Sequence, residues 1–177
     1  MVETELNDFL KKYYGEKKII ERIINQQVYL NPDAFTGDLK ASGVDLLVAT
    51  ELISKYLQSV DGIATVYTAS TIRSGDYKEG GMKGNLIRGY NNKRSGDICY
   101  DLEPQWLGWV SATGTTHGSG YTYDTHVPII FYGWGIKKGS SVLYHPITDI
   151  APTISVLLEI KFPSGCTGQP VAEALKD

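Results

Sequence analysis

The sequence predicts an α/β protein in which helices pack on a β-sheet. Residues 42–59 carry apolar side chains at helical intervals, and residues 62–70 and 96–102 have the composition of strands. Residues 127–134, VPIIFYGW, form a continuous apolar run, which is typical of a strand buried on both faces of a sheet. We therefore expect a mixed sheet with packed helices, in which residues 127–134 are the central strand.

The N-terminal segment predicts a short amphipathic helix followed by strand-forming sequence. Its apolar residues recur at helical intervals, and Gly15 suits a left-handed position at the helix end: Leu6, Phe9, Leu10 and Tyr13. Residues 19–30 mix β-branched and other apolar positions and are interrupted by Asn31-Pro32. A strand is expected at least over residues 27–30, whereas the half before it is ambiguous between helix and strand.

Two further helices have recognisable N-terminal signals. Ser42 resembles an N-cap with Asp45 three residues later, and the helix it opens is expected to end near Ser59. Near the C-terminus, Thr148 or Asp149 is expected to cap a helix that tolerates Pro152 in its first turn. The predicted core face of that last helix consists of Ile154, Val156, Leu157 and Leu158.

Composition excludes several classes of function. A chain of 177 residues fits one domain, and its formal net charge of -3 gives no basic excess for binding nucleic acid. No apolar run reaches the roughly 18 residues that a membrane span requires, so we expect neither nucleic acid nor membrane as a partner. Cys99 and Cys166 belong to no metal-binding spacing, and whether they pair is left open.

The common catalytic and nucleotide-binding motifs are missing. The glycine-rich stretch 74–85, SGDYKEGGMKGN, has neither the P-loop nor the dinucleotide-binding spacing, so a flexible surface loop is expected there. There is no GxSxG elbow and no HExxH pair. We assign no catalytic residue to this chain.

The stretch HGSGYTYDTH contains the candidate metal ligands. His117, Asp124 and His126 are residue types that bind zinc, so three ligands from one loop are conceivable. Asp124 and His126 equally suit a role in orienting the loop by hydrogen bonds to backbone amides. From these residues alone a structural role is favoured for each histidine, including His145.

The second half of the chain, from about Gly89 to the end, resembles the alkaline phosphatase superfamily, nearest to its PafA-like, type I phosphodiesterase and nucleotide pyrophosphatase branch. The likeness lies in GYNNKRSGDICYDLEPQWL, TGTTHGSGYTYDTHVPIIFYGWGI, TDIAPTISVLLEI and PSGCTGQPVAEAL. It implies an α/β/α sandwich with two zinc ions at the carboxyl ends of a central sheet, a threonine or serine nucleophile, and a phosphoric ester substrate. It also implies that His117 is the last zinc ligand, and that the parent protein is periplasmic or at the cell surface.

The chain departs from that family in what it lacks. The nucleophile segment and the Asp-His-Gly passage, which supply the other ligands, are absent, and no aspartate precedes a histidine directly or by four positions. We therefore expect residues 1–177 to be a single C-terminal fragment of a phosphatase or phosphodiesterase catalytic domain, whose partner is the missing N-terminal segment. Alone, the chain is expected to be inactive and to hold no zinc tightly. The alternative is a free-standing, non-catalytic binding or scaffolding domain derived from the same fold.

Overall fold

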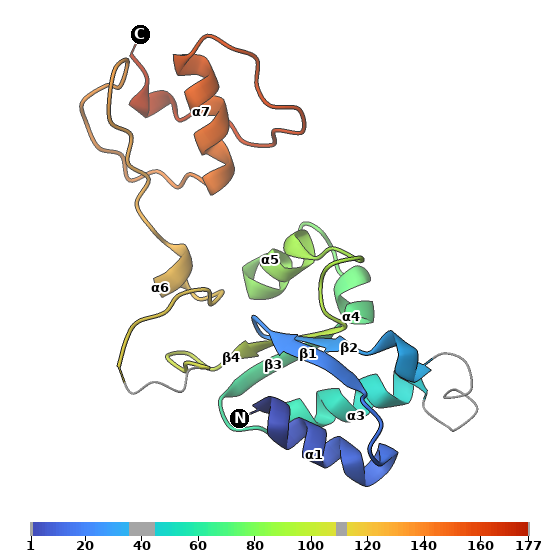
Figure 1. Cartoon of the computed structure of the whole chain (residues 1–177). Coiled ribbons are helices and arrows are strands. Elements are labelled where there is room, and N and C mark those ends of the chain that lie inside the picture. Colours follow the sequence, from blue (N-terminus) through green and yellow to red (C-terminus); the bar gives the residue numbers. More distant parts are fainter. Residues whose placement is uncertain (1, 36–44, 109–112, 177) are drawn as a thin grey trace. The chain divides into compact units, whose positions relative to one another are not determined.

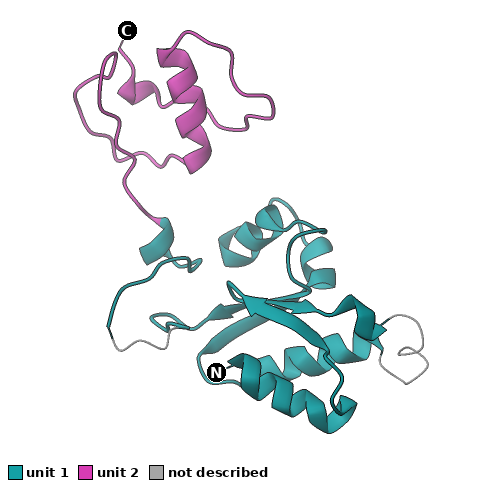
Figure 2. Cartoon of the chain, in the orientation of Figure 1, with its two compact units in different colours: residues 1–125 teal, residues 126–177 magenta. Residues whose placement is uncertain are grey.

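The computed structural model describes residues 2–35, 45–108 and 113–176. The chain divides into two compact units, residues 1–125 (unit 1) and residues 126–177 (unit 2), shown in Figure 2. Each unit has its own packing and is described separately. Within the described parts of the chain, no helix is long and apolar enough to cross a membrane.

Unit 1 is built on a four-stranded sheet with the order β1-β2-β4-β3. The strands are β1 (Ile20–Ile24), β2 (Gln27–Leu30), β3 (Ile63–Thr68) and β4 (Ile98–Leu102). All three pairings among the described residues are antiparallel, so the sheet seen here is not the mixed one that we expected. The parallel strands of a mixed sheet need crossover connections, and none of the described connections places two neighbouring strands parallel.

The first two strands form a tight hairpin, which resolves the ambiguous half of the 19–30 segment. Asn25 and Gln26 connect them with φ angles of 50° and 54°. Two successive positive φ angles are the backbone of a two-residue hairpin turn whose twist matches that of the strands. The segment before the predicted strand at 27–30 is therefore itself a strand.

Helices cover both faces of this sheet (Figure 1). Helices α1 (Val2–Tyr14) and α3 (Leu46–Gln58) pack on one face, and the shorter α4 (Ala69–Arg73) and α5 (Gly81–Gly89) lie on the other. The core between the sheet and the two longer helices is apolar and includes Leu6, Leu10, Val28, Ile53, Leu57 and Ile98. This three-layer arrangement confirms the predicted α/β/α fold class.

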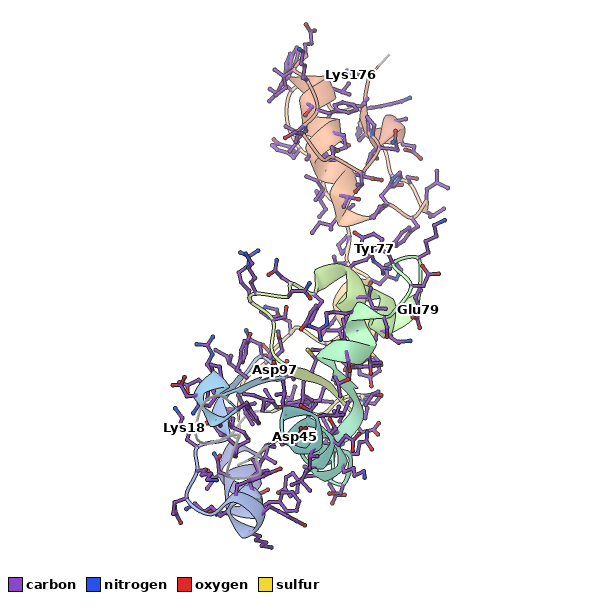
Figure 3. The ribbon with its side chains drawn as sticks, turned by 90° about the vertical axis from the view of Figure 1, so that its right-hand side faces the viewer. Lys18, Asp45, Tyr77, Glu79, Asp97 and Lys176 are labelled. Carbon is purple, nitrogen blue, oxygen red and sulfur yellow. The ribbon has the colours of Figure 1, made fainter. Side chains whose placement is uncertain are left out.

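The ends of the two long helices follow the local signals in the sequence. Gly15 has φ +62°, and its N–H donates to the carbonyl of Lys11 at 2.9 Å, which ends α1. Helix α3 begins at Leu46, where one carboxylate oxygen of Asp45 accepts hydrogen bonds from two backbone amides of the first turn (Figure 3). The predicted cap at Ser42 lies outside the described residues, and the cap of the helix that is seen is Asp45.

The expectation of a flexible loop over 74–85 is wrong for its second half. Helix α5 begins at Gly81, although glycines disfavour helices. The Arg88 guanidinium on this helix donates to the carbonyl oxygens of Tyr77 at 3.2 Å and Glu79 at 2.7 Å, so it ties the helix to the preceding loop. Figure 3 labels the two acceptor residues. Gly84 packs so closely on the Glu79 carbonyl that an added Cβ would lie 1.8 Å from the oxygen.

Unit 2 does not contain the predicted central strand. Residues 127–132 form no regular structure, and residues 133–135 form a turn. Ile130, Tyr132 and Trp134 have exposed fractions of 82%, 99% and 87%. A strand is stable only when neighbouring strands pair with it and layers cover its faces, and the described residues of unit 2 supply neither. The nearest β-type contact is an isolated antiparallel bridge between Ile136 and Leu175.

Among its described residues, unit 2 has one α-helix. This helix starts where the sequence predicts, but the face that it buries is not the predicted one. Helix α7 (Ile150–Leu157) follows the 3-10 turn η2 (Ile147–Asp149), and Pro152 lies in its first turn. Its buried residues are Pro152, Thr153 and Ser155, whereas the predicted core residues Ile154, Val156 and Leu158 have exposed fractions of 43%, 41% and 61%. The small polar face is buried because the backbone of residues 168–171 packs directly on it: the Val171 N–H donates to the Thr153 hydroxyl at 2.8 Å.

Candidate metal centre

His117 lies on an irregular segment that follows β4, and its side chain is exposed to solvent. Residues 113–125, which include the single helical turn at 122–125, are called the histidine loop. Gly114 and Gly118, on either side of it, have φ angles of +124° and +112°. Residues with a side chain rarely adopt these angles, so the glycines are what allow the backbone to present the histidine in this way. An exposed imidazole is free to bind a metal ion through either ring nitrogen.

Two tyrosines fix the far end of this loop. The Tyr121 hydroxyl donates to the carbonyl of Leu102, the last residue of β4, at 3.0 Å. The Tyr123 hydroxyl accepts from the Gln105 N–H at 3.2 Å, and the two rings stack with their centroids 5.6 Å apart. The histidine loop is therefore held at the carboxyl end of β4.

Gly120 brings the same loop against helix α5. A Cβ added at this glycine would lie 2.6 Å from Cγ of Met82. The absence of a side chain at Gly120 is thus required for the loop to pack on the helix as it does. Together with the tyrosine contacts, this packing positions the loop by unit 1 alone.

Asp124 holds the loop in shape. It lies on the single-turn helix α6 (Thr122–Thr125), and its Oδ2 accepts hydrogen bonds from the Ser119 amide at 2.9 Å and the Ser119 hydroxyl at 2.6 Å. These two bonds are the main reason that the pKa of the Asp124 carboxyl is lowered; a bond from the Gly118 amide and the nearby His117 ring lower the pKa further. These contacts agree with the orienting role that the sequence allowed for this aspartate.

The three candidate ligands do not form a metal site by themselves. Among the described residues, no group of three histidine, cysteine or acidic side chains is arranged to hold a metal ion. His117 and Asp124 lie on the same anchored loop of unit 1, whereas His126 is exposed and begins unit 2. Within the described chain, His126 makes no hydrogen bond or ion pair.

His145 has a structural environment. Its Nδ1 lies 3.3 Å from Oδ2 of Asp149, and its Nε2 lies 3.6 Å from Oε2 of Glu173, on the 3-10 turn η3 (Ala172–Ala174). Asp149 is buried and accepts another hydrogen bond, through Oδ1, from the Gln169 N–H at 2.9 Å. These contacts join the start of α7 to the C-terminal segment of unit 2.

Both cysteines are free thiols. Cys99 lies in β4 and is buried, and burial is the main reason that its pKa is raised to about 11. A protonated, buried thiol is a poor metal ligand and a poor nucleophile.

Of the side chains that hold the histidine loop, the sequence suggested Asp124 but did not identify the two tyrosines. Tyr121 and Tyr123 alternate in GYTYD, a spacing that is compatible with a strand as much as with the stacked pair that is observed. The hydrogen bonds that Ser119 donates to Asp124 join residues five positions apart in a turn-rich segment, and no local sequence motif predicts this pair. What the sequence does show is the glycines around His117, and in the structure Gly114 and Gly118 have positive φ angles that residues with a side chain rarely adopt.

Comparison with known proteins identifies relatives of this chain. No family model matches the chain. A protein from Myroides odoratus named calcium-transporting ATPase is 37% identical over 176 residues, and alkaline phosphatase PafA from Elizabethkingia meningoseptica is 37% identical over 174 residues. Alkaline phosphatase PhoV from Synechococcus elongatus is 34% identical over 177 residues. These matches cover 98–99% of this chain, and the chain spans about a third of the length of each relative.

Solved structures agree with the sequence comparison. The crystal structure of wild-type alkaline phosphatase PafA is 36% identical, with a TM-score of 0.85 over 98% of this chain and 32% of that one. A mutant of the same enzyme gives a TM-score of 0.84 over 99% of this chain and 33% of that one. The resemblance stated from the motifs is thus confirmed: in sequence and fold, the chain matches the C-terminal part of an alkaline phosphatase-like protein.

Proposed function

We propose that this chain, which matches the C-terminal part of alkaline phosphatase-like proteins, contributes to a catalytic domain that hydrolyses phosphoric esters with the help of zinc. In this proposal residues 1–177 form one portion of that domain, and both compact units belong to it. His117 is its last zinc ligand. The parent protein acts in the periplasm or at the cell surface, as the resemblance to that family implies.

The observation that carries the proposal is the position of His117 in a chain similar to alkaline phosphatases over nearly its whole length. The loop presents an exposed imidazole between two glycines at the carboxyl end of a strand, and unit 1 alone holds the loop there. Neutral imidazole nitrogen suits zinc, and zinc sites need ligands whose orientation is fixed by the surrounding protein. The residues present fit one ligand of a zinc site.

The residues of this chain have separable roles in that site. A zinc ion, when bound, polarises a phosphoryl oxygen and lowers the pKa of a coordinated hydroxyl. His117 holds the metal through one ring nitrogen. Asp124 does not need to bind it: its contact with Ser119 keeps the loop in shape, so the aspartate positions the ligand. We propose that the remaining ligands and the nucleophile belong to the part of such a domain that this chain does not span, since the chain covers about a third of the length of its relatives.

The name of the Myroides odoratus relative indicates a different activity from that of the phosphatases. We favour ester hydrolysis because two phosphatases match at similar identity, and because the matching solved structures are of a phosphatase. For this chain the assignment rests on the His117 loop and requires an experiment.

The test is a chimera in which this chain replaces the matching 174 residues of Elizabethkingia meningoseptica PafA. We expect zinc binding and hydrolysis of an aryl phosphate, and we expect His117→Ala to reduce turnover about 100-fold or more and to lower the zinc content. His126→Ala is the matched control, since this histidine is also exposed but is given no metal role. A folded chimera whose activity and zinc content are the same with His117→Ala contradicts the proposal and favours the non-catalytic scaffold.

The isolated chain provides an independent check. We expect no phosphatase activity, since no nucleophile is assigned, and no zinc binding at submicromolar affinity, since one imidazole competes poorly with water. Calorimetric titration of the chain with zinc measures this directly. Stoichiometric tight binding that His117→Ala abolishes would show that the chain completes a zinc site alone.

A further inference from the structure

We propose that Met82 is a reversible oxidation site through which a peroxide loosens the histidine loop. The chain has one methionine besides Met1, and its thioether lies where helix α5 meets the loop. The oxidation and its effect on the loop depend only on residues of this chain. The inference rests on the proposed function in one respect, that a looser loop holds zinc less well through His117.

The first observation is a close contact between the Met82 side chain and Gly120 of the histidine loop. A Cβ added at Gly120 would lie 2.6 Å from Cγ of Met82 and 3.0 Å from its Sδ. The unbranched, apolar thioether fits this contact because it adapts to irregular surfaces. Since the two parts already touch, there is no room between them for one further atom.

The second observation is that Met82 is within reach of a small oxidant. It lies in the first turn of α5, and its side chain is only half-buried. By contrast, Cys99 is buried, and burial is the main reason that the pKa of its thiol is raised to about 11. A protonated thiol reacts poorly with peroxides, so within unit 1 the thioether of Met82 is the more reactive sulfur.

The modification is a two-electron oxidation of the thioether by hydrogen peroxide. The O–O bond of the peroxide breaks, one oxygen forms a bond to Sδ of Met82, and the other oxygen leaves as water. The product, methionine sulfoxide, is polar and chiral, and methionine sulfoxide reductases return it to the thioether. The change falls on the contact itself, because Sδ is one of the Met82 atoms that lie nearest to Gly120.

Helix α5 is held in place by polar contacts of its own. The Arg88 guanidinium donates to the Glu79 carbonyl and to Oδ1 of Asn85, both at 2.7 Å. The Lys83 ammonium lies 3.0 Å from Oε2 of Glu79. An oxygen on the Met82 sulfur, with the water that hydrates it, therefore displaces the loop rather than the helix.

Gly120 lies directly between the two sets of contacts that shape the histidine loop. The residue before it, Ser119, donates to Oδ2 of Asp124 through its amide at 2.9 Å and its hydroxyl at 2.6 Å. The hydroxyl of the residue after it, Tyr121, donates to the carbonyl of the last residue of β4 at 3.0 Å. Displacement of Gly120 weakens both sets, so His117 loses the fixed orientation that a metal ligand needs.

The first experiment treats the full chain with hydrogen peroxide and measures amide exchange. Cys166→Ser is present throughout, so that its thiol does not react, and Met1 reports the extent of oxidation in every sample. We expect Met82 to gain one oxygen and the Ser119 amide to exchange about tenfold faster, since its hydrogen bond opens more often. The Leu30 amide, which donates to a carboxylate in the sheet at 2.9 Å, should keep its rate. A methionine sulfoxide reductase should restore the slow exchange.

Two substitutions separate the oxidation from the contact. Met82→Leu keeps a side chain of similar volume without sulfur, so exchange at Ser119 should be the same before and after peroxide treatment. Gly120→Ala adds one carbon to the loop side of the contact and should speed exchange at Ser119 without peroxide. Gly120 does not have a positive φ, so its backbone accepts alanine and contact with Met82 is the main obstacle.

The chimera with PafA tests the consequence for zinc. Peroxide treatment should lower its zinc affinity about tenfold or more, compared with the same chimera carrying Met82→Leu. The rest of the two chimeras is identical, so oxidation elsewhere affects both equally. An active chimera that loses zinc to the same extent with and without Met82→Leu supports the proposed function and overturns the oxidation site.

The exchange measurement on the chain itself does not depend on the proposed function. Faster exchange at Ser119 after oxidation, together with a chimera that binds no zinc, supports the oxidation site and counts against the function. Oxidised Met82 with unchanged exchange at Ser119 overturns the inference. The same conclusion follows when Met82 stays reduced while Met1 is fully oxidised.

Discussion

Unit 1 and unit 2 are stabilised by different kinds of interaction. Apart from Pro152 and Val171, the described hydrophobic side chains that are buried lie in unit 1, and most of them are enclosed by the sheet and helices α1 and α3. Unit 2 buries Thr153, Ser155 and Asp149, and leaves large apolar side chains such as Tyr132 and Trp134 in water. Unit 1 has the apolar core of an independent fold, whereas unit 2 is organised by polar bonds and keeps an apolar surface uncovered.

The two units differ in how much apolar surface they bury. Burial of apolar surface is the main favourable term in folding, and unit 2 gains little from it within the described residues. Its helix α7 and its C-terminal segment are linked by hydrogen bonds that centre on Thr153 and Asp149. Each unit should therefore be most sensitive to loss of its own kind of interaction, apolar packing in unit 1 and hydrogen bonding in unit 2.

The largest effect is expected in the core of unit 1. Ile53 is fully buried in α3, so Ile53→Ala should lower the free energy of unfolding of unit 1 by about 2–5 kcal/mol. Ile130→Ala, the same change at an exposed position in unit 2, should alter it by less than about 0.5 kcal/mol. Urea denaturation followed by circular dichroism measures both, and equal effects of the two variants would remove the basis of the comparison.

A polar substitution is expected to have the larger effect in unit 2. The Thr153 hydroxyl donates to the Asp149 carbonyl at 2.6 Å and accepts from the Val171 N–H at 2.8 Å. Thr153→Val keeps the shape but leaves the Val171 N–H unpaired, at a cost of about 1–3 kcal/mol. The expected result is faster amide exchange at Val171 and Gln169.

Thr153→Ser retains the hydroxyl and is the matched control for that change. It should preserve most of the exchange protection in unit 2. If the valine and serine variants exchange at the same rate, apolar packing rather than the hydroxyl holds this unit together.

A smaller effect is expected at the N-terminus of α3. Asp45 accepts from the amides of Leu47 at 2.8 Å and Val48 at 3.1 Å, so Asp45→Ala should destabilise unit 1 by about 1 kcal/mol. Asp45→Asn provides a similar acceptor and should remain within about 0.5 kcal/mol of the wild type. Thermal unfolding compares the two; an equal loss in both would mean that the charge of Asp45, rather than the cap, is responsible.

The smallest effect concerns the pH dependence of the histidine loop. The pKa of Asp124 is lowered from 3.8, chiefly by its bonds from Ser119, so the ionised carboxylate stabilises the folded loop. This contribution is fully present above the unfolded pKa, near 3.8, and is lost as pH falls through the lower folded value. The Ser119 amide resonance should therefore titrate in acid below that pH and not near neutrality.

Asp124→Asn gives the control for the acid titration. The variant lacks the titrating carboxyl, so the Ser119 resonance should show no transition in the same range. A Ser119 resonance that still titrates in the variant would assign the transition to another group.

The sequence by itself determined the elements whose causes are local. Helix α1 ends at Gly15, α3 ends at Ser59 and α7 begins after Asp149, as predicted, because periodicity, Gly15 and the first-turn Pro152 act within a few residues. The glycines around His117 similarly marked the loop, and the motifs marked the family. The assignment of His117 to zinc stays a prediction, since a ligand is defined by the other groups of its site.

Only the tertiary structure determined which faces are buried and which segments are paired, because both depend on the neighbours of each element. Residues 127–134 are apolar enough for a central strand, yet they are exposed because pairing and cover must come from other strands and layers. In α7 the face with Thr153 and Ser155 is buried because the backbone of residues 168–171 packs on it. The sequence pattern favoured the aliphatic face instead. Arg88 stabilises a helix in a glycine-rich segment by donating a hydrogen bond to the Glu79 carbonyl. Ser119 donates a hydrogen bond to Asp124 across a turn. A sequence pattern indicates how much apolar surface and how many polar groups a segment has. The tertiary structure determines which neighbouring groups cover that surface and form hydrogen bonds with those polar groups.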